Sequence, residues 1–118
     1  MASILICDDS AFTRNMIKDI LKMEGHQFLD AKDGNVLLNI VKDEKFDCIL
    51  LDLLMPHKDG FQVLAELKEM GNKVPVIVVS ADIQESSRQR CIELGAAAFL
   101  NKPPKQADLI NTINNAIR

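Results

Sequence analysis

The sequence predicts an α/β fold in which a doubly wound parallel sheet of five strands is covered by five helices. Short apolar runs alternate five times with longer segments whose apolar residues recur at helical spacing. Strands that alternate with helices form parallel sheets with right-handed crossovers. The run at residues 48–51 is apolar at every position and ends at Asp52. Such a run is typical of a strand buried between two helical layers.

Length and composition limit the possibilities. The 118 residues predict one domain, residues 1–118, and 47% of them are apolar, enough for a substantial core. The net charge of −3 gives no basic surface for direct nucleic-acid binding. The sequence shows no charged-then-apolar leader and no long apolar stretch, so we expect no export signal, no membrane contact and a cytoplasmic location. An output module would then be a separate protein or have been cut away.

The first half of the chain contains three predicted strands and two helices. The strands are Ser3–Cys7, Gln27–Ala31 and residues 46–51. Gly25 ends the first helix, because glycine readily adopts the left-handed conformation at a helix C-terminus. Asp33-Gly34 begins the second helix. The apolar residues that share one face are Phe12, Met16, Ile17, Ile20 and Leu21 in the first helix, and Val36, Leu37, Ile40 and Val41 in the second.

The second half contains three predicted helices and two strands, at residues 74–79 and 96–100. Capping-box spacing, in which a Gln or Glu follows an Asp by three residues, occurs at Asp59 and at Asp82. Each box is expected to begin a helix. The residues at helical spacing are Phe61, Leu64, Leu67 and Lys68 in the third helix, which ends at Gly71, and Leu109, Ile113, Ala116 and Ile117 in the last; the fourth helix is polar and ends at Gly95.

The three cysteines, Cys7, Cys48 and Cys91, are widely spaced and form no CxxC pair. Zinc binding and dithiol redox chemistry are therefore disfavoured. Cys7 and Cys48 lie in apolar runs, where a thiol acts as a small apolar side chain. We expect reduced, buried thiols.

Residues capable of chemistry follow four of the five predicted strands. They are Asp8 and Asp9 after the first strand, Asp52 after the third, Ser80 after the fourth and Lys102 after the fifth. Because parallel strands end at one edge of the sheet, we expect these groups to share one crevice. Three carboxylates repel one another unless a cation lies among them. A few hard oxygen ligands with room for water suit Mg²⁺.

A metal ion, an ammonium group and a hydroxyl around a carboxylate form a site for a phosphoryl group. They would neutralise its oxygens while Asp52 attacks in line and becomes an aspartyl phosphate. Singly, each residue has a structural explanation: Asp9-Ser10 as a helix cap, Asp52 as a turn residue, Ser80 as part of a loop. Four complementary groups at equivalent strand ends favour chemistry over coincidence.

Over its whole length the chain resembles the receiver domains of two-component response regulators. The motifs that carry the resemblance are Asp8-Asp9, the segment from Asp52 through Met55-Pro56 to Gly60, Ser80-Ala81 and Lys102-Pro103. Segments 8–12 and 16–21 look closest to stand-alone chemotaxis regulators of the CheY type. The resemblance implies a flavodoxin-like strand order, 2-1-3-4-5. It also implies a signalling switch that catalyses only its own phosphorylation and dephosphorylation.

The resemblance implies a role for each matching residue at the site. Asp52 would accept the phosphoryl group. Asp9 and Asp52 would bind Mg²⁺ directly, Asp8 would act through water, and the Leu54 carbonyl would be a backbone ligand. Lys102 would pair with the phosphoryl group, beside a peptide bond to Pro103 that is usually cis in the family.

The resemblance also implies a switch and a set of partners. Ser80 would bond a phosphoryl oxygen, and Phe99 would turn into the space under its loop. This would remodel the face formed by the fourth helix, the fifth strand and the fifth helix, where a downstream protein target binds. A sensor histidine kinase or phosphotransfer domain would be the donor, and a phosphatase is a further possible partner.

Four departures from the family pattern distinguish this chain. Phe99 has no hydroxyl, so switching must rest on packing. Lys58 adds a positive charge near the site, and Pro104 stiffens the segment after Lys102. Leu54 lies two residues beyond Asp52, as Asp82 does beyond Ser80, at positions that modulate loss of the phosphoryl group in the family. Because Leu54 offers no hydrogen bond to orient water, we expect slow self-dephosphorylation.

Other functions stay open at this point. Phosphatases of the haloacid-dehalogenase type also use an aspartyl nucleophile, but it follows the first strand with a second Asp two residues on, whereas Asp8 and Asp9 are adjacent. A phosphate-independent docking domain is disfavoured by the complete site. A flavin site lacks its phosphate loop and any Trp or Tyr.

Several polar residues are candidates for partner contacts, with a merely solvated surface as the alternative for each. A kinase could meet the first helix, and a target the later helices. His26 is expected in a solvated turn and His57 in an exposed loop. The candidates are Phe12, Asn15 and Lys18 for the kinase, and Arg88, Arg90, Lys105 and Asn111 for the target.

Overall fold

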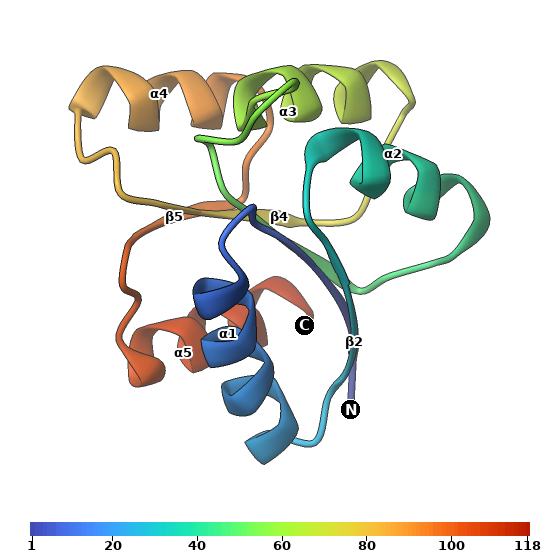
Figure 1. Cartoon of the computed structure of the whole chain (residues 1–118), viewed down its shortest axis with the longest axis vertical. Helices are drawn as coiled ribbons and strands as arrows, with labels where there is room; N and C mark the ends of the chain where they lie inside the picture. Colours follow the sequence, from blue (N-terminus) through green and yellow to red (C-terminus); the bar gives the residue numbers. More distant parts are fainter.

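The computed structural model describes residues 1–118 and confirms the alternation of strands and helices. Five parallel strands form one sheet in the order β2-β1-β3-β4-β5, as the resemblance implied. Helices α1 and α5 cover one face of the sheet, and α2, α3 and α4 cover the other (Figure 1). The elements are β1 (Ser3–Cys7), α1 (Ala11–Met23), β2 (Gln27–Ala31), α2 (Gly34–Asp43), β3 (Cys48–Leu51), α3 (Gly60–Glu69), β4 (Val76–Ser80), α4 (Glu85–Glu93), β5 (Ala98–Asn101) and α5 (Gln106–Ala116).

The last three strands each begin two residues later than predicted. The predicted starts were residues 46, 74 and 96, and the observed starts are Cys48, Val76 and Ala98. Phe46 is only 8% exposed, and Val74 and Ala96 are partly buried against the core, whereas Ala97 is exposed. An apolar run reports burial, whereas a strand requires a continuous hydrogen-bond ladder. The apolar pattern therefore predicted each strand to start two residues too early, in the segment that leads into the strand.

Alternate strand residues face two separate cores. Leu5, Ile49 and Val78 belong to the cluster under α2, α3 and α4. Ile6, Leu50 and Ile77 belong to the cluster under α1 and α5. Both faces of the central strands are therefore buried, which explains why β3 has no polar residue before Asp52.

One of the two predicted capping boxes is confirmed, and Asp33 caps the helix that it was expected to begin. The Asp33 carboxylate accepts a hydrogen bond from the Val36 N–H at the start of α2. Asp59 and Gln62 form the predicted capping box of α3. The box predicted at Asp82 is wrong, because α4 begins after Gln84 and has no side-chain cap.

The Asp82 carboxylate instead accepts hydrogen bonds from the Gln84 N–H, at 3.0 Å, and from the Ser87 hydroxyl. Both are local contacts, so they compete with capping geometry. Asp82 thus ties the loop after β4 to the first turns of α4 without capping the helix.

Phe12 does not face the core as the helical spacing predicted. Its side chain is 79% exposed, whereas Ile17, Ile20 and Leu21 are buried. The first turn of α1 lies beside the loop that follows β1, at the edge of the sheet. Phe12 therefore remains available for an intermolecular contact.

All three cysteines are buried and free, as predicted. Burial raises the pKa of Cys7 and of Cys48 to about 12. These thiols stay protonated at neutral pH, so they act as apolar side chains. None of the five helices has the length and apolar content that crossing a bilayer requires.

Candidate functional site

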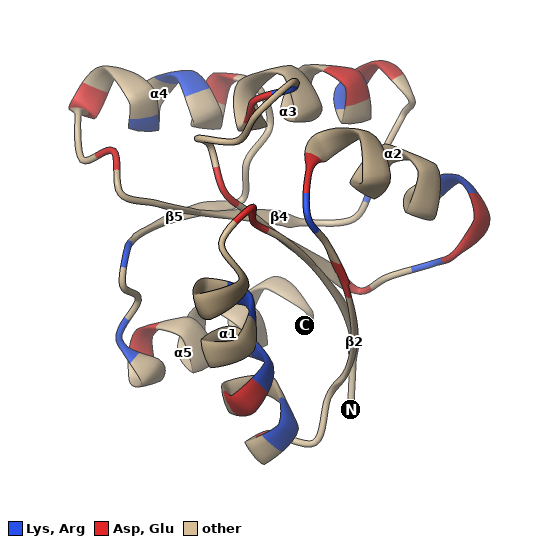
Figure 2. Cartoon of the chain, in the orientation of Figure 1, with Lys and Arg blue, Asp and Glu red and all other residues tan.

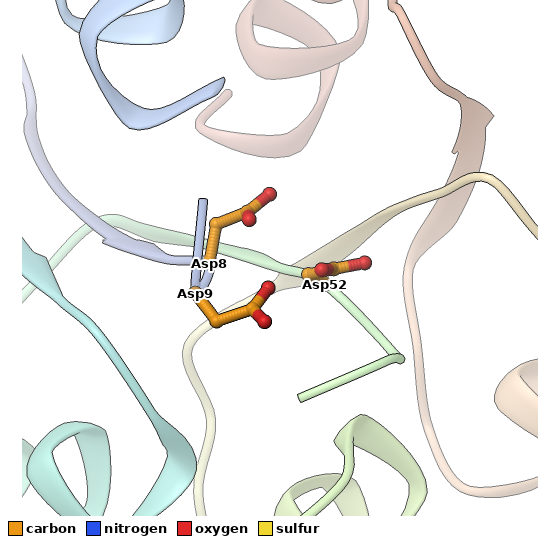
Figure 3. Close-up of side chains that lie close together, drawn as sticks. All are labelled: Asp8, Asp9 and Asp52. Carbon is orange, nitrogen blue, oxygen red and sulfur yellow. The ribbon is translucent and has the colours of Figure 1, made fainter. Parts of the chain in front are cut away.

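The loops after β1 and β3 begin side by side. Cys7 and Leu51 are partners in the ladder, and the next N–H along, that of Asp52, donates to the Cys7 carbonyl at 2.9 Å. The residues that follow each strand therefore emerge at the same level of the sheet edge. Figure 3 shows Asp8 and Asp9 beside Asp52 at this point.

The three carboxylates form one cluster, as the sequence predicted. Carboxylate oxygens of Asp8, Asp9 and Asp52 all lie within 4.8 Å of one another. Asp8 is 2% exposed and Asp52 is 4% exposed, whereas Asp9 is open to solvent. Figure 2 shows acidic segments where the chain leaves the centre of the sheet. Two of the three carboxylate residues are thus buried, and the cluster is accessible to solvent at Asp9.

Lys102 reaches into the cluster from the loop after β5. Its Nζ lies 2.7 Å from Asp8 Oδ2 and 3.1 Å from Asp52 Oδ2. The Lys102 N–H donates to the Ser80 carbonyl at 2.9 Å, which fixes the start of this loop against β4. The Lys102–Pro103 peptide bond is cis, which confirms the expectation from the resemblance.

Main-chain donors orient the other carboxylate oxygens. Asp8 Oδ1 accepts from the Ser10 N–H, and Asp52 Oδ1 accepts from the Leu53 N–H, both at 2.8 Å. Each buried carboxylate therefore has one oxygen held by the backbone and the other facing Lys102. This fixed arrangement reduces the reorganisation needed when a ligand binds.

The protonation of the cluster reflects crowded negative charge. Burial raises the pKa of Asp52, the nearby Asp8 carboxylate raises it further, and Lys102 opposes both. Burial favours the neutral form of Lys102, but its hydrogen bonds to Asp8 and Asp52 outweigh burial and raise its pKa. One ammonium group therefore pairs with two of the three carboxylates, and the cluster remains short of positive charge.

This donor set fits Mg²⁺. Carboxylate oxygens are hard ligands, a small number of them leaves room for water, and a divalent cation would balance the remaining negative charge. The orientation of Asp8 and Asp52 by backbone N–H groups supplies the outer contacts that metal ligands generally need.

Ser80 and Phe99 lie on the same side of the site. Ser80 ends β4, is completely buried, and its Oγ accepts a hydrogen bond from the Asp82 N–H at 3.1 Å. Phe99 pairs with Val78 on the neighbouring strand and is partly buried against the core under α2, α3 and α4. The two predicted switch positions are therefore in adjacent strands, and Ser80 directly precedes the loop that carries Asp82.

The structure changes the interpretation of Lys58. Its ammonium group pairs with the Glu66 carboxylate on α3. The charge that was expected to act near the site is therefore already neutralised by a neighbour. Loop position alone indicated proximity, but the direction of the side chain depends on how the loop packs against α2 and α3.

The two histidines lie in different environments. His57 is exposed, as predicted, and has a positive φ of 69°. His26 is not simply solvated, because its Nδ1 accepts a hydrogen bond from the Ala2 N–H at 3.0 Å. It ties the start of β1 to the turn after α1. Neither belongs to the acidic cluster.

Sequence reasoning missed Arg14. Its Nη1 donates to the Asp8 carbonyl at 2.6 Å, and its Nε donates to Asp30 Oδ2 at 3.0 Å. No spacing rule links Arg14 to Asp30, because their contact depends on how β2 pairs with β1. Among the candidate partner residues, Arg90 lies 4.1 Å from the centre of the Phe61 ring and is thus engaged within the molecule.

Comparison with known proteins agrees with this arrangement. The family model for the response regulator receiver domain matches residues 4–114. The chain is 36% identical over 118 residues to the transcriptional regulatory protein CpxR of Klebsiella pneumoniae. It is 35% identical over 100 residues to the sensor histidine kinase RcsC of Escherichia coli K12. These matches cover 100% and 85% of this chain, but only 50% of CpxR and 10% of RcsC.

Solved structures of similar length superpose closely. The Vibrio cholerae chemotaxis protein CheY4 matches with a TM-score of 0.92 and 26% identity, covering 98% of each chain. The receiver domain of the sensor histidine kinase PA1611 from Pseudomonas aeruginosa matches with a TM-score of 0.90 and 26% identity, covering 98% of this chain and 97% of that one. That structure has a magnesium ion coordinated in its active-site cleft.

Proposed function

This chain belongs to the family of response regulator receiver domains, and from that premise we propose that it is a phosphorylation-activated switch with Asp52 as the phosphoacceptor. The observation that carries the proposal is the Lys102 ammonium group between Asp8 and Asp52, inside a cluster of three carboxylates. A buried nucleophile, a fixed cation and a metal-compatible donor set are the parts that phosphoryl transfer to a carboxylate needs.

The proposed reaction uses these groups in fixed roles. An Asp52 carboxylate oxygen attacks phosphorus, the new O–P bond forms, and the P–N bond to a donor imidazole breaks, with its electron pair returning to the nitrogen. Bound Mg²⁺ supplies positive charge to the phosphoryl oxygens. Asp9, Asp52 and the Leu54 carbonyl would hold it, with Asp8 acting through water.

Lys102 and Ser80 would meet the transferred group. The Lys102 ammonium group already contacts Asp52 Oδ2 and can transfer one hydrogen bond to a phosphoryl oxygen. Ser80 Oγ accepts from the Asp82 N–H, which leaves its O–H proton to donate to the same group. Engagement of Ser80 would draw in its loop and open space for Phe99.

A switch that catalyses only its own phosphorylation and dephosphorylation needs other proteins as phosphoryl donor and as target. A sensor histidine kinase or phosphotransfer domain supplies the phosphoryl group, and RcsC, a sensor histidine kinase, includes a region similar to 85% of this chain. A target protein reads the face formed by α4, β5 and α5. A phosphatase partner would shorten the signal.

The finer proposal is a stand-alone regulator of the chemotaxis type. The match to CheY4 over 98% of both chains supports it. The match to half of CpxR favours the alternative, a receiver domain that works with an output module. A pull-down that compares the phosphorylated protein with Asp52→Asn would identify the target. Capture of a chemotaxis component would support the chemotaxis type, and capture of a transcription component would contradict it.

The test of the function is phosphorylation by acetyl phosphate. With Mg²⁺, wild-type protein is expected to gain the mass of one phosphoryl group, because acetyl phosphate replaces the kinase as donor. Asp52→Asn is expected to gain none, since an amide is not a nucleophile of this kind. Intact-protein mass spectrometry measures both, and Asp43→Asn, at an exposed carboxylate on α2, is the matched control.

The alternatives predict different results. A phosphate-independent docking domain would show no mass gain in the wild type. A phosphatase of the haloacid-dehalogenase type would release phosphate continuously from a small phosphomonoester. Labelling of Asp52→Asn as fast as wild type would exclude Asp52 as the acceptor.

Leu54→Asn is expected to speed loss of the phosphoryl group. Leu54 is 64% exposed beside the cluster and offers no hydrogen bond to water. One neutral hydrogen bond contributes about 1 kcal/mol, which corresponds to roughly a fivefold change in rate. The decay of phosphorylated protein, followed by mass spectrometry after donor removal, measures the rate.

Leu54→Ala separates orientation of water from access to it. It shortens the side chain without adding a polar group, so its rate is expected to stay close to that of the wild type. Equal acceleration in both variants would assign the effect to access, and an unchanged rate in Leu54→Asn would contradict the prediction.

A further inference from the structure

Arg14 contacts the main chain of the acidic cluster but does not pair with its carboxylates. It belongs to the second turn of α1, and its Nη1 donates to the main-chain carbonyl of Asp8 at 2.6 Å. The arginine side chain is 17% exposed, so the contact is largely shielded from water. Hydrogen bonds from a charged donor are stronger than neutral ones.

Asp30 on β2 anchors the guanidinium group. Asp30 Oδ2 lies 3.0 Å from Arg14 Nε and 2.9 Å from Lys18 Nζ. Asp30 pairs with Ile6 in the ladder between β2 and β1, and Ile6 faces α1. The sheet therefore directs Asp30 towards α1, where two basic residues one turn apart meet it. Of these two basic residues, only Arg14 also contacts the acidic cluster, through the Asp8 carbonyl.

The peptide group that Arg14 holds joins Asp8 to Asp9. Because a peptide group is planar, fixing its oxygen restricts the direction in which the Asp9 side chain leaves the backbone. Asp8 is already held through its N–H, which donates to Ala31, and through both carboxylate oxygens. Asp9 is exposed, so the peptide plane is the restraint that matters most for it.

We propose that Arg14, anchored by Asp30, is a positioning residue that sets the Mg²⁺ affinity of the site by fixing the Asp8–Asp9 peptide group. The inference rests on the proposed metal site and deepens it. Arg14 reaches Asp30 and the Asp8 carbonyl with two different nitrogens of its rigid guanidinium group, Nε and Nη1. A lysine has one nitrogen at the end of a flexible chain, so it does not reproduce this fixed geometry. Residues that orient metal ligands typically change affinity 10- to 100-fold when replaced.

The deciding variant is Arg14→Lys, which keeps the positive charge and loses this fixed geometry. Titration calorimetry with Mg²⁺ alone is expected to show about tenfold weaker binding than in the wild type. Asp30→Asn, which removes the anchor, is expected to weaken Mg²⁺ binding in the same direction. Lys18→Ala removes the other ion pair of Asp30 without touching Asp8, and its Mg²⁺ affinity is expected to match the wild type.

A second measurement separates positioning from stability. Urea unfolding in EDTA reports the metal-free fold, where Arg14→Lys and Lys18→Ala are expected to shift the midpoint to a similar, small extent. Unchanged Mg²⁺ affinity in Arg14→Lys, or equal weakening in Lys18→Ala, overturns the inference while leaving the proposed function intact. A wild-type protein that binds no Mg²⁺ overturns the metal site itself, and the inference with it.

Discussion

Gly60→Ala is expected to destabilise the protein by about 3 kcal/mol, at the upper end for an overpacked site. Gly60 is the first residue of α3, and its N–H donates to the Leu53 carbonyl at 2.9 Å. A Cβ at this position would lie 2.5 Å from the Asp52 carbonyl oxygen and 2.8 Å from the Leu53 Cα. These are backbone atoms at the end of a buried strand, so they cannot move aside cheaply.

The same clash would displace the phosphoacceptor. A shift of the Asp52 backbone changes the position of its carboxylate relative to Lys102, so labelling by acetyl phosphate is expected to slow as well. Urea unfolding measures the stability, and mass spectrometry measures the labelling.

Gly25→Ala and Gly71→Ala are the matched controls. A Cβ at either position meets nothing within 4 Å, but both residues have a positive φ, of 76° and 75°. Left-handed backbone costs a non-glycine residue about 1–2 kcal/mol. A Gly60→Ala variant as stable as the wild type would show that the close approach at Gly60 relaxes without strain.

Lys102→Met is expected to destabilise the metal-free protein by about 2 kcal/mol at pH 8. Lys102 is the ammonium group between Asp8 and Asp52, and both carboxylates are almost fully buried. Removing one partner of a buried ion pair typically costs 3–5 kcal/mol. The lysine side chain is 18% exposed, so we discount that range for solvent screening.

The destabilisation is expected to shrink as the pH falls. Burial and Asp8 already raise the pKa of Asp52, and the variant loses the opposing effect of Lys102. The folded variant then binds more protons than the unfolded chain above the ordinary pKa of an aspartate, so its stability falls as the pH rises. Relative to wild type, it should be least stable at high pH and recover towards acid pH.

Urea unfolding at several pH values, in EDTA, measures this difference. Lys45→Met, at an exposed loop lysine, controls for the loss of one positive charge. A Lys102→Met variant as stable as wild type at pH 8 would show that the two carboxylates do not need this partner. Added Mg²⁺ is expected to reduce the difference in stability between the wild type and Lys102→Met, since the ion supplies positive charge to the same carboxylate oxygens.

The fold was predictable because, for most elements, the residues that favour helix ends or strands locally agree with the pattern of buried apolar residues. Apolar runs placed all five strands, and Gly25, Gly71 and Gly95, all with positive φ, ended their helices as expected. The errors occur where two local rules compete. Asp82 has capping-box spacing, but its carboxylate bonds to Gln84 and Ser87 instead. The two-residue errors at strand starts arise because burial extends beyond the ladder.

The acidic site was predictable because parallel topology brings strand ends together. That rule placed Asp8, Asp9, Asp52 and Lys102 in one cluster. The rule does not predict contacts that depend on strand register or on side-chain direction. The Arg14–Asp30 pair is one such contact, since it depends on Asp30 lying opposite Ile6.

The three buried cysteines have a practical consequence. Their thiols are free, and those of Cys7 and Cys48 stay protonated well above neutral pH. Thiol reagents attack the exposed thiolate form. A single cysteine introduced on the surface of α4 would therefore react selectively with a fluorescent reagent while the native thiols remain in place. The fold thus provides a low background for an optical reporter of the movement that Ser80 is proposed to start.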